Sequence, residues 1–499
     1  MTKRIRIFFL LLFFSTNIFS QQKIGEFESA SGFRKTSQAV VYSLRNQNGY
    51  QVNLQIIDNI IRSKYDSNFS LIASYDYFTQ DYTFNQSFRN TPIYNQDLQF
   101  GQNYYEVYSD KKDVIVITPD FKRKKDSVVF SQSLKNNTRG EMRVGILPFS
   151  NSLGILCFSK KENKLYLYKW HQSGLIDSIE IALPESSLSP DEIKKYTKAA
   201  AIKYKAAFRK MRISKADETS VIGIISNNAL YYSNEKIWLL TETPFYTGYN
   251  ILEIDIKNES ISSSNYMIND MRRNVEAKKE FVKKPYALIW GNNLIIRNSS
   301  YYTFEYEFYD LSTKQLIKKY DSFDGDSLTN LIQSDFNQKG TFISGKIGKK
   351  IDNEKAFIRK IAAGEGFIIV SKSDIDSITI TTGSIKEIQG IEGTLLTAAQ
   401  FILTYGGNKV FDYLLSGYIT AFRDKLVYCH SRFSLDGFNL SSANNITTKL
   451  DNLLKNVEKR DFNSPSTTIF TIGKQYVVAV FNISTRKFEL FTISNEQDN

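Results

Sequence analysis

The sequence predicts an all-β fold made of many short antiparallel strands, with a few inserted helices. Two observations predict it. Aromatic and β-branched residues alternate with polar residues along short runs, and one strand–turn–strand pattern recurs at a nearly constant spacing. Alternation with a period of two places one set of side chains on each face of a strand. A chain of 499 residues is long enough to bury a large core without disulfide bonds.

The clearest strands are short runs in which every second residue is apolar. They are Lys164–Trp170, Tyr249–Ile256, Tyr302–Leu311 and Tyr476–Ile483. Several such strands separated by polar turns are typical of a sandwich, a barrel or a propeller. The alternation alone is compatible with all three architectures.

A repeated hairpin helps to choose between them. Ile254–Ile261 reads as apolar, Asp or Asn, apolar, four polar residues and apolar, and Tyr309–Leu316 and Phe481–Phe488 repeat this pattern. The second copy starts 55 residues after the first, and the third starts 172 residues after the second, or about three such units. A constant spacing is what repeated structural units produce. Weaker copies occur at Gln38–Leu44 with Tyr50–Ile57, Ile117–Val128, Tyr168–Leu175, Ile369–Ile375 and Phe433–Phe438.

At the level of this strand–turn–strand unit the architecture resembles a β-propeller, which arranges four-stranded sheets around a central channel. The resemblance implies an irregular propeller of seven blades, with eight as the alternative. The chain lacks the Gly-His and Trp-Asp signature of one familiar propeller repeat, so no family can be named. The competing interpretation is a pair of unrelated β-domains whose turns agree by accident.

The N-terminus has the pattern of a cleavable signal peptide. Lys3, Arg4 and Arg6 precede an apolar run over Ile7–Phe14, and Ser20 provides a small residue at the cleavage site. An uncleaved membrane anchor is the alternative, although the run is shorter than the roughly 20 residues that span a bilayer. We therefore expect a signal peptide at 1–20, an N-terminal extension at 21–36 and the propeller domain at 37–495. This organisation predicts a protein of the periplasm or cell surface with no transmembrane span in the mature chain.

The strongest helix prediction is a basic insert at 188–212. Ser189 caps it, Pro190 occupies its first position and Glu192 completes a capping box. Lysines and arginines collect on the face opposite the apolar stripe. We single out as candidate partner-binding residues Lys194, Lys195, Lys198, Lys205 and Arg209. The preferred interpretation of these charges is a solvated face on a docked helix, and a basic platform for an anionic partner is the alternative.

Two further segments are helix candidates, Asn269–Lys284, which is basic, and Ser442–Glu458, which has an apolar stripe. Removal of the three signal-peptide cations lowers the formal net charge from +12 to +9. This excess suits anionic polymers, lipid headgroups or acidic proteins. A nucleic acid partner is not expected for an exported protein.

Cysteine and histidine are scarce, which argues against several kinds of catalytic and metal site. Cys157 and Cys429 are interpreted as two buried free thiols, with one long-range disulfide as the alternative. In a strand, Cys429 and His430 face opposite sides, so we expect a core cysteine beside an exposed histidine. His171 is expected in a polar turn. The acidic run Asp321–Asp326 lacks the spacing of a calcium loop and is interpreted as a solvated turn. We predict no cofactor, no metal and no catalytic residues.

These observations favour an exported, non-enzymatic binding or scaffold protein that uses a propeller face and basic helical inserts to hold a protein or glycan partner. The alternative is a glycan-active hydrolase or lyase that uses carboxylates on the propeller face. Three or more acidic side chains converging at the mouth of the central channel would favour that alternative. A third hypothesis is peripheral attachment to a membrane through the basic inserts.

Overall fold

The computed structural model describes the strands, most of the short turns and part of the longer connections. Described are residues 23–28, 38–43, 49–56, 59–66, 71–78, 93–100, 103–109, 113–133, 141–159, 161–162, 164–174, 176–182, 212–216, 229–242, 248–267, 285–323, 328–339, 349–386, 425–441, 446, 448, 451, 467–472, 475–482, 485 and 487–493. The predicted signal peptide lies outside these residues.

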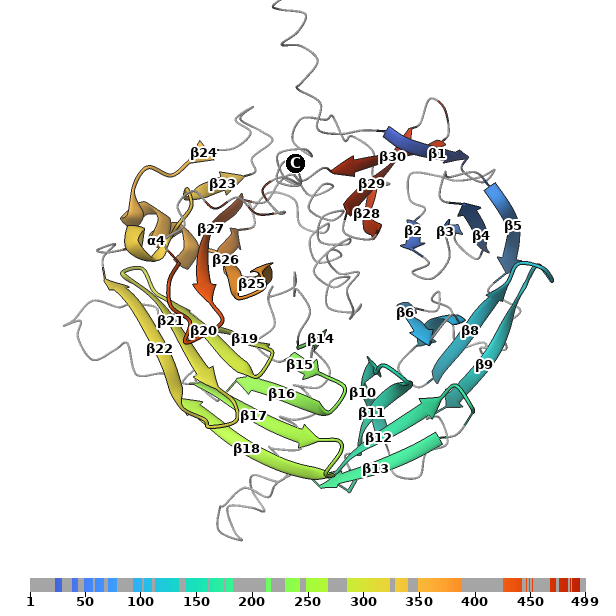
Figure 1. Cartoon of the computed structure of the whole chain (residues 1–499), viewed down its shortest axis with the longest axis horizontal. Coiled ribbons are helices and arrows are strands. Elements are labelled where there is room, and N and C mark those ends of the chain that lie inside the picture. Colours follow the sequence, from blue (N-terminus) through green and yellow to red (C-terminus); the bar gives the residue numbers. More distant parts are fainter. Residues whose placement is uncertain are drawn as a thin grey trace, which may run out of the picture.

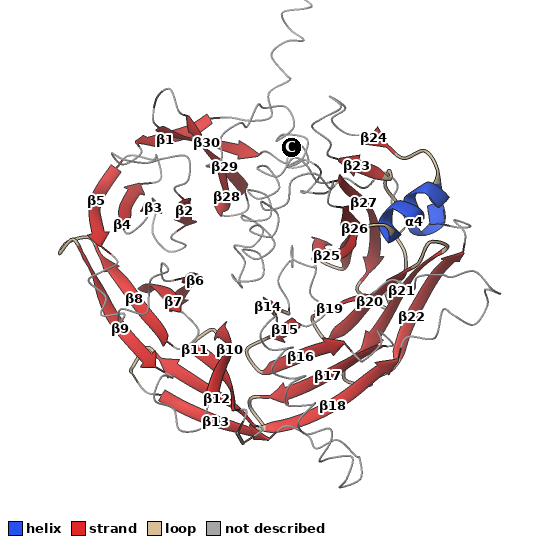
Figure 2. Ribbon diagram, turned by 180° about the vertical axis from the view of Figure 1, so that it is seen from behind, coloured by secondary structure: helices blue, strands red, loops and turns tan. Residues whose placement is uncertain are grey.

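The described strands form seven sheets arranged around a ring, each with one strand near the centre and one at the outer rim (Figure 1). The chain is therefore a β-propeller, and the predicted fold class is confirmed. Seven described sheets agree with the preferred blade number, but the number of blades in the whole chain stays a prediction. The alternative of two unrelated β-domains is wrong, because all seven sheets share one ring (Figure 2).

The first three complete sheets follow the chain from the inner to the outer strand. The first contains β2 (Gln38–Ser43), β3 (Gly49–Ile56), β4 (Asn59–Asp66) and β5 (Leu71–Phe78). The second contains β6 (Ile93–Phe100), β7 (Asn103–Ser109), β8 (Asp113–Asp120) and β9 (Lys125–Ser133). The third contains β10 (Glu141–Pro148), β11 (Ser152–Ser159), β12 (Lys164–His171) and β13 (Ile176–Ala182).

The next two sheets continue this order, and the first of them has an extra inner strand. It contains β14 (Arg212–Lys215), β15 (Ala229–Tyr232), β16 (Lys236–Glu242), β17 (Gly248–Asp255) and β18 (Ser260–Met267), with β14 parallel to β15. The other contains β19 (Tyr286–Trp290), β20 (Asn293–Ser299), β21 (Thr303–Asp310) and β22 (Leu316–Phe323).

The last two sheets depart from this order. In one, β25 (Glu365–Asp374), β26 (Ser377–Lys386) and β27 (Lys425–Ser434) are completed on the outside by β23 (Asn337–Lys339) and β24 (Lys349–Lys350), which come earlier in the chain. In the other, β28 (Thr467–Ile472), β29 (Gln475–Asn482) and β30 (Lys487–Ile493) are completed by β1 (Lys23–Glu28).

The N-terminal strand β1 closes the ring. It pairs antiparallel with β30, with Phe27 opposite Phe488, and Lys487 Nζ donates to Glu26 Oε1 at 2.6 Å. Residues 23–28 were expected to belong to an extension that precedes the propeller. They are instead the outer strand of its last sheet, because the chain end supplies the strand that β28–β30 lack.

The predicted repeat corresponds to one kind of tight hairpin. In the β17–β18 turn, Asp255 Oδ1 accepts hydrogen bonds from the backbone N–H groups of Lys257 and Asn258, which fixes the start of the turn. The β21–β22 turn begins in the same way at Asp310, which accepts from Thr313 N. Near the end of each turn one residue adopts a left-handed backbone, Glu259 at φ 49° and Lys314 at φ 60°.

The weaker copies at β8–β9 and β12–β13 are hairpins of the same outer position, and the β12–β13 turn uses Gly174 at φ 88° for the left-handed residue. The copy at Phe481–Phe488 spans β29 and β30, which are the second and third strands of their sheet. The pattern therefore marks tight polar turns in general rather than one fixed position within a blade.

The core lies between neighbouring sheets. Phe308 of β21 stacks on Phe438 at 4.5 Å between ring centroids and packs against Phe433 of β27 at 5.0 Å. A second cluster joins the β10–β13 and β14–β18 sheets, and a third joins the β6–β9 and β10–β13 sheets. Apolar contacts between blades therefore stabilise the part of the ring from β6 to β27.

Two helices occur among the described residues, α3 (Leu328–Leu331) and α4 (Glu354–Ala362). Asn353 caps α4 through its side chain, which accepts from Ala356 N, and Phe357 stacks on Phe336 at 4.4 Å. Figure 2 shows α4 at the outer rim beside β23 and β24. Within the described part of the chain, no helix is long and apolar enough to cross a bilayer.

The predicted helices fall mainly outside the described residues. The prediction for 188–212 is wrong at its end, because Arg212 is the first residue of β14. The Asn269–Lys284 candidate lies outside the described residues, and only three residues of Ser442–Glu458 are described. One of these, Ile446, is buried, as its place in the predicted apolar stripe requires.

Candidate functional site

The ring has two faces, and contacts between blades distinguish them. On the first face the innermost strand of each sheet begins. There Tyr249, near the start of β17, donates its hydroxyl to Pro285 O at 2.6 Å, and Gly366 N at the start of β25 donates to Tyr286 Oη at 2.7 Å. Because neighbouring strands are antiparallel, the outer strand of a sheet ends on this same face. We call it the insert face.

On the opposite face lie the turns from the first to the second strand of a sheet and from the third to the fourth. There Ser150 Oγ donates to Asn234 Oδ1 at 2.9 Å, and Gly291 N donates to Ala216 O at 2.8 Å. These contacts join turns of adjacent blades. We call this the turn face.

Three of the four longest connections between described strands begin and end on the insert face, and the fourth, 435–466, starts at the end of β27 on the turn face. Residues 183–211 join the end of β13 to the start of β14, residues 268–284 join β18 to β19, and residues 387–424 join β26 to β27. The first two are basic, with seven lysines and arginines against three carboxylates in 183–211 and six against three in 268–284. The candidate residues Lys194, Lys195, Lys198, Lys205 and Arg209 belong to the first connection and lie outside the described residues.

A hydroxyl, an imidazole and a carboxylate lie in line on the β25–β27 sheet. Thr381 Oγ1 and His430 Nδ1 are 2.8 Å apart, because the two residues are paired across β26 and β27. The other nitrogen of the same imidazole, His430 Nε2, lies 2.8 Å from Asp451 Oδ2. Tyr428 donates to the second oxygen of Asp451 at 2.9 Å. No local pattern predicts this arrangement, since Asp451 follows His430 by 21 positions and no motif accompanies the two residues.

The surroundings of this group explain the acidity of Asp451. Burial alone would raise its pKa, but the hydrogen bonds from His430 and from Thr448 outweigh burial and hold the pKa of Asp451 at about 2. The order of groups resembles a catalytic triad, yet Thr381 is 3% exposed and His430 is 0% exposed. A substrate has no access to a hydroxyl at that depth. The group therefore anchors Asp451, and Thr448 which bonds to it, to the sheet.

The expectation of an exposed His430 is wrong. Cys429 and His430 do face opposite sides of β27, but both sides are covered, and both residues are fully buried.

His171 lies at the end of β12, partly exposed, with Nε2 2.9 Å from Asp177 Oδ2. Cys157 and Cys429 are buried free thiols in different sheets, so the preferred interpretation is confirmed and the disulfide alternative is wrong. Burial raises the pKa of both thiols.

Arg297 ties two blades together. Its side chain is 1% exposed. Its guanidinium donates to Gly383 O at 2.9 Å and to Thr382 Oγ1 at 3.2 Å, across from β20 to β26. The guanidinium also lies 4.7 Å from the ring centre of Tyr286. Within the described residues no carboxylate lies at ion-pair distance, and burial lowers the pKa of Arg297. A Cβ atom on Gly366 would come within 2.4 Å of this guanidinium, so glycine is required there.

Arg62 makes a second link between blades, this time with carboxylates. It joins β4 to the next sheet through Glu106 Oε1 at 2.7 Å and Asp126 Oδ2 at 2.7 Å, and all three side chains are 0% exposed. Tyr75 donates to the other oxygen of Asp126 at 2.6 Å. This carboxylate pair is closed to solvent and engaged by a guanidinium. It therefore lacks the access that a glycan-cleaving pair needs.

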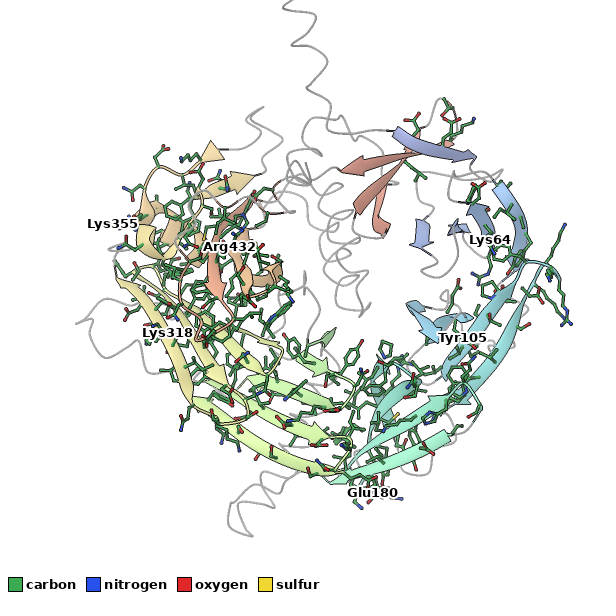
Figure 3. All side chains as sticks on the ribbon, viewed as in Figure 1. Lys64, Tyr105, Glu180, Lys318, Lys355 and Arg432 are labelled. Carbon is green, nitrogen blue, oxygen red and sulfur yellow. The ribbon has the colours of Figure 1, made fainter. Side chains whose placement is uncertain are left out.

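The described residues contain no cluster of three or more potential metal ligands. Of the acidic run Asp321–Asp326, Asp321 lies in β22 with an exposed side chain, and 324–326 lie outside the described residues. Asp374 is exposed at the end of β25 and lies 3.9 Å from Arg432. Figure 3 shows how densely side chains fill the space between the sheets.

No protein-family model matches the chain, and no curated protein matches its sequence. Solved structures that resemble it include the WD40 domain of SCAP from fission yeast, with 8% identity over 72% of this chain and 70% of that chain and a TM-score of 0.32. The Nup133 β-propeller domain from Vanderwaltozyma polyspora has 9% identity over 70% and 81%, with a TM-score of 0.32. The Dos1 propeller has 8% identity over 80% and 78%, with a TM-score of 0.29. At these scores the fold assignment depends on the arrangement of the sheets themselves.

Proposed function

We propose that this protein is an exported, non-enzymatic binding or scaffold protein of the periplasm or cell surface. It holds a protein or glycan partner on the insert face of its propeller. The observation that supports this proposal is the difference between the two faces. Short turns join successive strands on one face, while three of the four longest connections between described strands begin and end on the other. Long connections on a rigid repeat scaffold are the usual place for recognition.

Charge gives the insert face its preference for a partner. The connection between β13 and β14 carries Lys194, Lys195, Lys198, Lys205 and Arg209, and the connection between β18 and β19 is also basic. Both begin and end on the insert face. A concentration of cations at one end of the ring attracts an acidic partner and increases its rate of association.

The described polar groups that resemble catalytic machinery support binding rather than catalysis. The Thr381–His430–Asp451 group has no access to solvent at its hydroxyl, and the Glu106 and Asp126 carboxylates are engaged by Arg62. Both groups link parts of the scaffold. Their role is to keep the ring rigid, which lowers the entropic cost of presenting a binding surface.

Co-purification from the native envelope tests the proposal. A variant with Lys194, Lys195, Lys198, Lys205 and Arg209 changed to Gln is expected to lose a partner that the wild type retains. The matched control changes five dispersed exposed lysines to Gln, namely Lys161, Lys257, Lys314, Lys355 and Lys372. Equal loss in both variants, or equal retention, contradicts the assignment of the partner to the insert face. Intact mass of the purified protein is expected to give a chain that starts at Gln21, and a chain that retains residues 1–20 would contradict export with cleavage.

A further inference from the structure

The turn between β8 and β9 is unlike the other hairpin turns of the ring. It presents four consecutive exposed cations, Lys122, Arg123, Lys124 and Lys125, which we call the basic turn. Within the described residues, Arg123 alone among them has an ion-pair partner, Asp120 at 3.7 Å, and its side chain is still 74% exposed. The remaining positive charge faces solvent.

The fold does not require this charge. The β17–β18 turn occupies the same position in its sheet and carries one lysine, Lys257, beside Asp255 and Glu259. The β21–β22 turn likewise contains one lysine, Lys314, and one carboxylate, Asp310. Both turns form with the same Asx hydrogen bonds as the basic turn, so a balanced sequence is sufficient to make this hairpin. Four adjacent like charges repel one another and are an addition to the turn motif.

The basic turn is held in a fixed conformation. Asp120 Oδ1 accepts from the N–H groups of Lys122 and Arg123, both at 3.0 Å. The ring of Phe121 packs edge-on against Tyr75 of the neighbouring blade at 5.2 Å. Lys124 has a φ of 53°, a left-handed backbone that a lysine adopts at a cost. The cations are therefore presented by a preorganised hairpin.

A pair of exposed valines follows on the same strand. The pairing of β9 with β8 shifts register between Val128 and Phe130, which leaves Val129 as the extra residue of a β-bulge. As a result, Val128 is 51% exposed and Val129 is 39% exposed. At about 3.3 Å per residue, these side chains lie roughly 10–13 Å along the strand from Lys125.

We propose that the basic turn and this valine pair form a docking surface for an anionic lipid bilayer. Cations bind the headgroups while the valines enter the boundary with the acyl chains, a combination typical of proteins that lie on membranes. An acidic polypeptide would pair with the cations but has no need of the valines. Sugars are commonly bound by stacking on an exposed aromatic ring, and Phe121 in this turn is packed against Tyr75. The inference goes beyond the proposed function, because it uses the turn face and leaves the insert face free for a partner.

Vesicle sedimentation tests the proposal with protein purified as the cell processes it. The wild type is expected to pellet with phosphatidylcholine vesicles that contain phosphatidylglycerol, at about 0.1 M salt, and not with pure phosphatidylcholine. Changing Lys122, Arg123, Lys124 and Lys125 to Gln should lower the partition coefficient at least about tenfold. The matched control changes Lys161, Lys257, Lys355 and Lys372 to Gln, which removes the same charge from dispersed sites. Figure 3 labels Lys355, which lies across the ring from Lys64 and the neighbouring β8–β9 hairpin. This control variant should bind the vesicles with a partition coefficient within about twofold of the wild type.

A second pair of variants separates a bilayer from a soluble polyanion. Val128→Ser with Val129→Ser should weaken vesicle binding severalfold, whereas Leu316→Ser with Ile317→Ser, an exposed pair beside a balanced turn, should not. Equal loss in the charge-matched control, unchanged pelleting of the basic-turn variant, or insensitivity to the valines would each overturn the proposal. Binding to soluble polyglutamate that needs the basic turn, without vesicle pelleting, would point to an acidic protein instead. Unchanged thermal unfolding of each variant checks that the fold is retained.

Discussion

Replacement of Arg62 by Met should destabilise the protein severely. The side chain is fully buried and donates to Asp126 Oδ2 from Nε at 3.0 Å and from Nη2 at 2.7 Å, and to Glu106 Oε1 at 2.7 Å. Met fills much of the volume but leaves two buried carboxylates without their guanidinium. Removing one partner from a buried ion pair costs about 3–5 kcal/mol, far more than the pair itself contributes. We expect the free energy of unfolding to fall by that amount.

Urea unfolding followed by tryptophan fluorescence measures this loss, because Trp170 packs against Tyr105 and Phe130 in the core beside the β6–β9 sheet. The triple variant Arg62→Met, Glu106→Gln, Asp126→Asn should recover a large part of the stability, since no uncompensated charge remains. Arg123→Met, on the exposed basic turn, should change the unfolding free energy by less than about 0.5 kcal/mol. The reasoning is refuted if the free energy of unfolding of Arg62→Met lies within about 1 kcal/mol of the wild-type value. It is also refuted if the triple variant is no more stable than Arg62→Met.

Two further predictions follow from hydrogen bonds described above. The pKa of Asp451 is lowered to about 2, so its contribution to stability is complete above its unfolded pKa of about 3.9 and is lost as the pH falls through 2. Unfolding at several pH values should show Asp451→Asn less stable than the wild type by about 2 kcal/mol at neutral pH, with the gap closing between pH 4 and pH 2, and a constant gap would contradict this. Deletion of Lys23–Glu28 should expose β30 as an edge, so that hydrogen exchange of its amides facing β1 accelerates at least about tenfold, while β20 exchanges as before. Unchanged exchange in β30 would argue against closure by β1.

The local strand pattern predicted most of the fold. Alternation identified β12, β17, β21 and β29 within one or two residues of their bounds, because a strand buried on both sides still separates its two faces by residue type. The Asx turn was visible as well, since Asp255 and Asp310 bond to the backbone directly after them. Repetition of that turn was enough to predict a ring of similar sheets.

Long-range and short-helix features escaped the sequence analysis for physical reasons. The pairing of β1 with β30 joins chain ends that no local pattern connects. Helix α4 is only nine residues long, so its apolar stripe and its cap at Asn353 are too short a pattern to stand out in the sequence. His430 is contacted by Gln333 and Ser334 at its backbone and by Asp451 at its imidazole, and these residues come from other parts of the chain. The alternation within a strand predicts which face of the sheet a histidine lies on, but not which residues bury it.

The closing strand has a consequence for biosynthesis. Glu26 and Lys487 are separated by 461 positions, yet they lie side by side in the last sheet. Among the described strands β1 is made first and its partner β30 last, so their pairing requires nearly all of the described chain. Joining such distant partners is slow, since loop closure precedes any gain from the contact. Until this pairing forms, β1 and β30 each present an unpaired strand edge, which is a site for association with another chain.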